Sequence, residues 1–232
     1  MIKRGFFGMT AFIAGAILVF SLAGCNSGGP FTGTWIGNTT ETDEGGESLP
    51  ALVVFTQTEW MLSIPMLPYL ERGTYTYSGN NAAISGGIGA GTAVITSGTL
   101  TLTFSDFDEA SIKFTQKNPS AVSLNANTWV DGTITASAGL LLYSFNAVNG
   151  TTYNIWTNDS YSGDGSKSID SVFHVFNSDG HSYGNGDDCW EYPFTFTATS
   201  SGRVFIAVSA SIYSSSQTGS FAAAYSTSAS RP

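Results

Sequence analysis

The chain has 232 residues, of which only 11% are charged, against about a quarter in ordinary soluble proteins. Its net charge of −9 excludes general binding to the nucleic-acid backbone, and two histidines and two cysteines exclude His-rich metal sites and a disulfide scaffold. A hydrophobic content of 42%, with many Thr, Ser, Tyr and Phe residues, excludes a coiled coil or a helical bundle and favours strands.

The N-terminus has the layout of a secretory signal peptide. Lys3 and Arg4 precede residues 5–24, which carry no charge. That stretch runs into Leu22-Ala23-Gly24-Cys25, which resembles the lipobox of bacterial lipoproteins in all four positions. The resemblance implies that residues 1–24 are removed as a signal peptide and that Cys25 is lipidated. The alternative is an uncleaved anchor helix, because the uncharged stretch is long enough to span a bilayer.

A lipidated Cys25 would attach the mature chain to a membrane, with residues 25–30 as the lipidated cysteine and its tether. Asn26, where an Asp would favour retention at the inner membrane, favours the outer membrane or the cell surface of a bacterial envelope. Cys189 then has no intrachain partner. We expect it to be buried and unreactive, because Asp187 and Asp188 beside it raise a thiol pKa.

Residues 31–117 read as short strands separated by turn residues. Thr99 to Phe104 alternates strictly, with Leu100, Leu102 and Phe104 on one face. The segment resembles the small lipocalin-like barrels of bacterial lipoproteins in Gly33-Thr34-Trp35, the strand around Trp60, Gly73-Thr74-Tyr75 and Leu100-Thr101-Leu102-Thr103-Phe104. The resemblance implies an up-and-down barrel of eight strands with Trp35 in its core. We expect side chains to fill it, and a bound hydrophobic ligand is the alternative.

Lys117-Asn118-Pro119-Ser120 marks a seam, and residues 119–232 form a second unit in which Asn149-Gly150 predicts a hairpin. This unit resembles the bacterial pre-peptidase C-terminal (PPC) domain. The matching elements, in family order, are Tyr143-x-Phe145-x-Ala147, Asp170-Ser171, Asn177-Ser178-Asp179-Gly180, Asp187-Asp188, Ser201-Gly202 and Thr218-Gly219-Ser220-Phe221. The resemblance implies a non-catalytic, jelly-roll-like β-sandwich, and some family members bind calcium or matrix polymers such as collagen. The fold class is therefore all-β, a barrel followed by a sandwich.

Acidic residues gather in the second unit between residues 159 and 191. Hard oxygen ligands at this density suit Ca²⁺, although the spacing is not that of an EF-hand. No cofactor is required by any motif, and Ca²⁺ is the candidate ion, with Asp170, Asp179, Asp187 and Asp188 as its expected ligands. The alternative is that these carboxylates cap turns and solvate surface loops.

Aromatic residues lie in or beside the same acidic loops, and they are Trp156, Tyr161, Tyr183, Trp190 and Tyr192. Exposed rings among Gly, Asn and Asp can stack on sugars, so the candidate ligand-binding residues are Trp156, Tyr183, Trp190 and Tyr192. Core packing is the alternative for Trp156. No nucleophile elbow, phosphate loop or zinc motif occurs in the sequence, and His174 lies within an apolar strand pattern, so we expect no catalysis.

The sequence therefore predicts a non-catalytic, lipid-anchored envelope or surface protein. We expect its second unit to bind an extracellular polymer, a matrix protein or a polysaccharide, and we expect no nucleic-acid partner. One alternative is a carrier of a small hydrophobic ligand in the barrel. The other is a purely structural or assembly lipoprotein.

Overall fold

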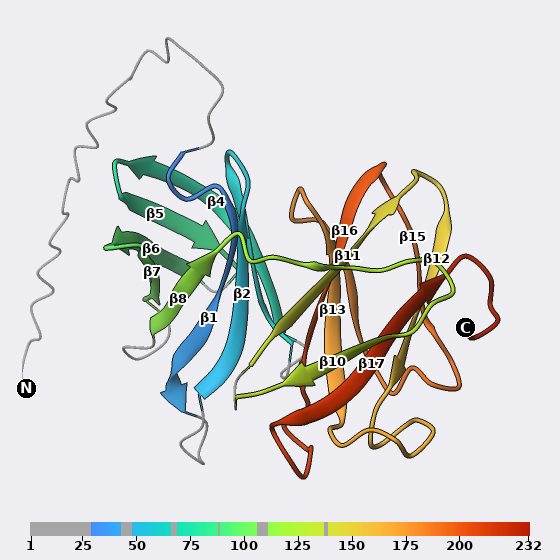
Figure 1. The fold of residues 1–232 in the computed structure, drawn as a ribbon. Helices are drawn as coiled ribbons and strands as arrows, with labels where there is room; N and C mark the ends of the chain where they lie inside the picture. Colours follow the sequence, from blue (N-terminus) through green and yellow to red (C-terminus); the bar gives the residue numbers. More distant parts are fainter. Residues whose placement is uncertain (1–28, 43–47, 66–68, 88, 106–110, 137–138) are drawn as a thin grey trace, which may run out of the picture.

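The computed structural model describes residues 29–42, 48–65, 69–87, 89–105, 111–136 and 139–232. The signal peptide, Cys25 and the start of the tether lie outside the described residues. A barrel and a two-sheet sandwich lie side by side (Figure 1), which confirms the predicted all-β class. Across the described ranges no helix is long and apolar enough to cross a bilayer.

The barrel is a closed antiparallel meander in which each strand pairs with its neighbour in sequence and β8 pairs with β1. Its strands are β1 (Gly33–Thr42), β2 (Ser48–Phe55), β3 (Glu59–Ile64), β4 (Tyr69–Ser78), β5 (Asn81–Gly86), β6 (Gly89–Thr96), β7 (Thr99–Phe104) and β8 (Ser111–Lys117). Closure brings β1 so near to β8 at Gly37 that a Cβ there would overlap the backbone of Lys113 and Phe114. Only glycine fits this contact.

Large side chains occupy the barrel interior. Leu100, Leu102 and Phe104 are all buried on one face of β7, as their alternation predicts. Trp35 is buried as well, and its indole Nε1 donates a hydrogen bond of 2.8 Å to the carbonyl of Phe31. Trp35 therefore packs in the core, in agreement with the expectation drawn from the resemblance.

The sandwich consists of a four-stranded sheet, ordered β10-β17-β12-β15, and a five-stranded sheet, ordered β14-β13-β16-β11-β9. Its strands are β9 (Val122–Ser123), β10 (Val130–Ile134), β11 (Leu141–Ala147), β12 (Thr152–Asn158), β13 (Ser171–Asn177), β14 (Ser182–Asp187), β15 (Phe194–Thr197), β16 (Gly202–Ala210) and β17 (Gly219–Ser226). The predicted hairpin at Asn149-Gly150 is wrong. The turn forms, with Gly150 at φ 78°, but it carries the chain from one sheet to the other, because β11 pairs with β16 and β12 with β15 and β17.

The barrel and the sandwich share an apolar interface. Strands β2 and β3 are buried on both faces along most of their length, so their outward side chains are covered too. Those side chains form one cluster with residues from the outer face of the five-stranded sheet, and its members are Leu52, Val54, Met61, Leu142, Phe176 and Ala207. The continuous apolar runs of these strands therefore reflect burial on two sides.

The registers fix which loops share an end of the sandwich. Ser171 at the start of β13 pairs with Ala210 at the end of β16, and Asn158 at the end of β12 pairs with Ala222 near the start of β17. Loops 159–170, 188–193 and 211–218 therefore meet at one end, at the bottom of the view in Figure 1. We call this end of the sandwich the loop end.

Candidate functional site

Three carboxylates converge at the loop end. Asp159 follows β12, Asp170 precedes β13 and Asp188 follows β14, and one side-chain oxygen from each lies within 4.8 Å of the others. Loop contacts hold them together, since Ser162 Oγ donates to the carbonyl of Asp188 over 3.5 Å and Ser214 Oγ accepts from the amide of Asp170 over 3.1 Å. We call these three residues the carboxylate cluster.

Asp159 is the most firmly held member of the carboxylate cluster. It is 1% exposed, and its Oδ1 accepts hydrogen bonds from the amides of Tyr161 and Ser162 at 3.1 and 2.8 Å. Its Oδ2 accepts from Ser171 Oγ at 2.8 Å. Burial raises the pKa of Asp159, and these hydrogen bonds oppose the rise.

Asp188 has an unusual backbone conformation and an unpartnered side-chain oxygen. Its backbone has a left-handed φ of 49°, and its Oδ1 is enclosed without a hydrogen-bond partner among the described residues. Burial, followed by the charges of Asp187, Asp170 and Asp159, raises its pKa to about 6. Burial and the neighbouring carboxylates also raise the pKa of Asp170. Like charges that are enclosed together in this way favour a shared proton or a bound cation.

The structure brings together two of the four expected calcium ligands. Asp170 and Asp188 belong to the cluster, whereas Asp187 is exposed beside it and acts on it through charge. Asp179 lies in the β13–β14 turn, at the opposite end of β13, so its assignment to the same site is wrong. Asp159 is the third member instead, and sequence reasoning missed it. Its position directly after an apolar strand is the sequence signal that could have identified it.

The expected aromatic platforms are mostly packed. Trp156 is buried, with its indole Nε1 donating to Ser226 Oγ at 3.1 Å, and Tyr183 stacks on Phe196 at 4.4 Å. Trp129 and Arg231 both contact the ring of Trp190, at centroid distances of 5.6 and 3.8 Å. Trp156 is therefore a core residue, and Trp190 is a stacking partner of the C-terminal segment.

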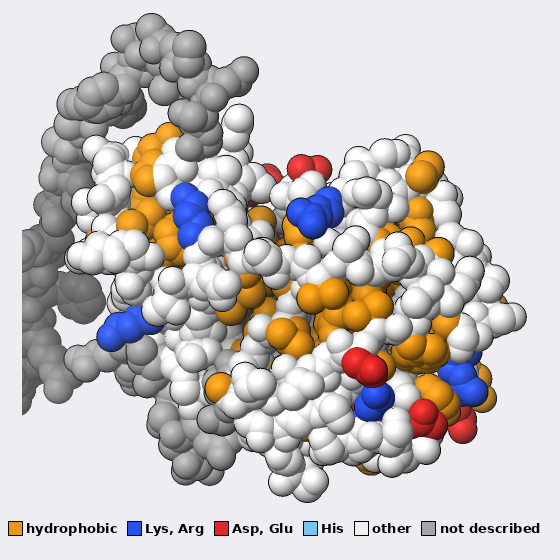
Figure 2. Space-filling view, in the orientation of Figure 1, with side chains coloured by type: hydrophobic (Ala, Val, Ile, Leu, Met, Phe, Trp, Pro, Cys, Tyr) orange, Lys and Arg blue, Asp and Glu red, His pale blue; other side chains and the backbone are white. Residues whose placement is uncertain are grey.

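Tyrosines supply the exposed rings of the loop end. Tyr192 is 80% exposed, as a ligand platform requires. Tyr161 in loop 159–170 and Tyr213 in loop 211–218 are 75% and 87% exposed. Tyr161 is one of the aromatic residues noted in the acidic loops of the sequence, whereas Tyr213 was not expected there. Their Ser- and Gly-rich surroundings in the sequence were the available signal, because such loops cannot bury a large ring. Acidic side chains are also visible on this part of the surface (Figure 2).

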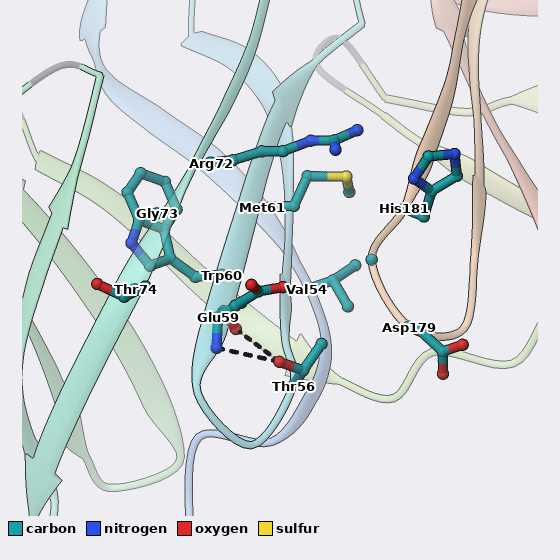
Figure 3. A pocket seen from close by; sticks show the side chains of 11 residues that line it. Val54, Thr56, Glu59, Trp60, Met61, Arg72, Gly73, Thr74, Asp179 and His181 are labelled. Atoms are coloured by element: carbon teal, nitrogen blue, oxygen red, sulfur yellow. Dashed lines mark hydrogen bonds between the residues drawn. The ribbon is translucent and has the colours of Figure 1, made fainter.

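A cleft of about 300 Å³ separates the barrel from the β13–β14 turn. Arg72 and His181 lie toward one end of it, and Glu59 and Asp179 toward the other (Figure 3). Its floor is apolar and includes Met61. This cleft is where Asp179 is found, well removed from the carboxylate cluster.

His174 and Cys189 are two potentially reactive side chains that the fold buries. His174 is buried in β13, its Nε2 lies 2.6 Å from Ser182 Oγ, and burial, with a smaller effect of Arg72, lowers its pKa to about 4. Cys189 is buried, and burial, with the neighbouring carboxylates, raises its pKa to about 12. A thiol with this pKa is not a nucleophile at neutral pH.

No protein family matches the chain, and no curated protein matches it. Among solved structures it is similar to the pre-peptidase C-terminal domain of a collagenase from Bacillus anthracis, with 15% identity and a TM-score of 0.36 over 47% of this chain and 98% of that one. It is also similar to PliG, a periplasmic inhibitor of g-type lysozyme from Aeromonas hydrophila, with 16% identity and a TM-score of 0.33 over 46% and 96% of the two chains. Likenesses this distant say nothing about function.

Proposed function

We propose that this protein is a non-catalytic, lipid-anchored protein of the bacterial envelope that binds an extracellular partner through the loop end of its sandwich. The observation that carries the proposal is that Asp159, Asp170 and Asp188 converge at the same end of the sandwich as three exposed tyrosines. Surface loops that carry charged groups and exposed aromatic rings, and that a rigid sandwich holds at one end, are typical of a binding surface.

Ca²⁺ is the ion that fits the carboxylate cluster. Hard carboxylate oxygens are its preferred ligands, and the enclosed, unpartnered Oδ1 of Asp188 is an acceptor that a cation would satisfy. Asp159, Asp170 and Asp188 would hold the ion, and it would fix the loops that carry Tyr161 and Tyr192. The ion would be a structural ligand of the binding surface.

The position of the tether supports presentation of the loop end away from the membrane. Gly33 at the start of β1 pairs with Phe55 at the end of β2, and Gly180 in the β13–β14 turn packs near Val54 and Thr56 of the same region. The first described residues, in dark blue, therefore share an end with that turn, opposite the loop end (Figure 1). An anchor at Cys25 would leave the loop end pointing outward.

Charge favours a matrix protein as the partner. The loop end carries two cationic residues, Lys167, which is paired with Asp131, and Arg231, which lies on the ring of Trp190. Against them stand six acidic residues, which are Asp159, Asp164, Asp170, Asp187, Asp188 and Glu191. A partner rich in Lys and Arg complements this surface, whereas a neutral polysaccharide does not. The packed barrel interior gives the carrier alternative no comparable support.

The test compares binding of the full-length protein to immobilised collagen and to immobilised dextran, in Ca²⁺ and in EDTA. We expect Ca²⁺-dependent binding to collagen that falls at least about tenfold when Tyr161, Tyr192 and Tyr213 are all changed to Ser. Tyr77→Ser on the barrel is the matched control and should bind as the wild type does. Equal binding by the triple variant would contradict the proposal, and binding to dextran alone would replace the protein partner by a polysaccharide.

The anchor has its own test. Palmitate should label the wild-type protein in cells and should not label the Cys25→Ser variant. The mature wild-type protein should also have lost residues 1–24, as measured by mass spectrometry. A wild-type protein that keeps residues 1–24 and takes up no palmitate would favour the uncleaved anchor helix instead.

A further inference from the structure

A polar groove lies at the end of the sandwich opposite the loop end. It has a volume of about 510 Å³ and lies where the segment after the barrel crosses from β11 to β17, pairing through Ser123 with β11 and through Ala126 with Tyr225. Its polar lining residues are Ser123, Asn125, Ser144, Asn146, Arg203 and Tyr225. We call it the linker groove.

Arg203 is held in place at the linker groove. Its Nε donates a hydrogen bond of 3.1 Å to Oγ of Ser144, which is 1% exposed, and its guanidinium lies 5.3 Å from the ring centroid of Phe205. Within the described part of the chain, no hydrogen bond or ion pair engages its two terminal nitrogens. They remain available as a fixed pair of donors, which is the geometry that binds a carboxylate through two bonds.

The remaining lining residues suit hydroxyl groups. The side chains of Asn125 and Asn146 are exposed, and each amide offers both donors and an acceptor. The ring of Tyr225 is stacked on Phe145 with centroids 4.1 Å apart, so it forms a rigid, half-buried wall. Mixed amide, hydroxyl and aromatic groups of this kind match the hydroxyls and ring faces of a sugar.

Charge decides which sugar fits. None of the residues that line the linker groove is acidic, and Arg203 places a positive charge there in a chain whose net charge is −9. A single fixed cation among neutral donors does not suit a polyphosphate backbone, which requires several. We infer that the linker groove binds an acidic saccharide, with a uronate carboxylate on Arg203 and neighbouring hydroxyls on Asn125 and Asn146. This inference is independent of the loop end and of calcium.

Calorimetry on the full-length protein in detergent and EDTA tests the inference, with trigalacturonic acid and its methyl ester as the two probes. The ester keeps the hydroxyl groups and loses the charges. We expect the acid to bind at millimolar concentrations and the ester to bind at least about tenfold more weakly, because each charge-assisted hydrogen bond is strong. Equal affinity for acid and ester, or no heat from the acid, would overturn the inference.

Variants separate Arg203 from general charge effects. Arg203→Gln should weaken binding of the acid at least about tenfold, whereas Lys113→Gln, which removes a positive charge from an exposed position of the barrel, should change it less than about twofold. Asn146→Ala touches no core contact and should weaken binding severalfold, which keeps the test informative if Arg203→Gln disturbs folding. If Asn146→Ala and Arg203→Gln, measured as single variants, both bind the acid with the affinity of the wild type, the inference is overturned.

Discussion

Ser171 Oγ donates a hydrogen bond of 2.8 Å to Oδ2 of Asp159, and this bond joins the two sheets of the sandwich at the loop end. Ser171 begins β13 in the five-stranded sheet, and Asp159 follows β12 in the four-stranded sheet. The bond therefore fixes the carboxylate that faces Asp170 and Asp188. The geometry of the cluster depends on it.

Ser171→Ala should destabilise the protein. The Asp159 carboxylate would retain a longer 3.4 Å bond from the Ser171 amide on that oxygen, and loss of a buried hydrogen bond to a charged group costs about 1–3 kcal/mol. Urea unfolding measures the change. Ser209→Ala is the matched control, because Ser209 is fully buried and its Oγ has no partner among the described residues. That variant should be neutral or stabilising, and equal losses in both variants would contradict this account.

Asp188→Asn should raise the melting temperature in EDTA. The substitution removes one of three enclosed like charges and leaves a side chain of the same shape. Differential scanning calorimetry in EDTA measures the shift. Asp179→Asn, in the exposed turn at the other end of β13, should leave the melting temperature unchanged. A lower melting temperature for Asp188→Asn would show that its charge is stabilised by contacts other than those described.

His174 should make the protein less stable in acid. Its pKa is lowered from 6.5 to about 4 in the folded state, chiefly by burial, while Arg72 on β4 also disfavours the charged form. The unfolded chain therefore takes up the proton first, so this contribution to stability is complete above pH 6.5 and is lost as the pH falls toward 4, amounting to about 3 kcal/mol.

Urea unfolding between pH 7 and pH 4 checks this contribution. The difference in unfolding free energy between the wild type and His174→Gln should shrink as the pH falls. Asn146→Ala, which changes an exposed side chain without a titrating group, is the control and should give a constant difference. A constant difference for His174→Gln as well would mean that the histidine titrates alike in both states.

Phe176→Ala should uncouple the barrel from the sandwich. Phe176 is fully buried in the cluster between them and stacks on Phe205 with centroids 5.4 Å apart. Removing a buried phenylalanine costs about 3–5 kcal/mol, and here the cost falls on the interface. We expect one unfolding transition in the wild type and two in the variant, measured by tryptophan fluorescence and calorimetry. A single transition in Phe176→Ala would contradict the role of this interface.

The architecture followed from the sequence, because period-2 alternation and regularly spaced turns report directly on strands. Leu100, Leu102 and Phe104 illustrate this, since their spacing alone predicts one buried face. The hairpin at Asn149-Gly150 was wrong because a turn dipeptide fixes the local bend and leaves open whether the next strand returns to the same sheet. Pairing between distant strands decides that.

The candidate site was half predicted for the same reason. Asp170 and Asp188 were identified from acidic density, but only the registers of β12, β13 and β14 reveal that Asp159 joins them and Asp179 does not. The prediction of exposed aromatic rings was wrong for a different reason. Trp156 and Tyr183 lie on strands, where pairing and packing cover a ring, whereas Tyr192 lies in a loop that cannot bury it.

Thermal unfolding of the chain from residue 27 onward, first with Ca²⁺ and then with EDTA, shows directly whether the carboxylate cluster binds a cation. An ion that binds only the folded state at 100 times its dissociation constant stabilises it by about 2.7 kcal/mol, which raises the melting temperature of a chain of this size by several degrees. We expect that rise, its reversal by EDTA and its absence in Asp188→Asn. An unchanged melting temperature in saturating Ca²⁺ would contradict the claim that Asp159, Asp170 and Asp188 form a cation site.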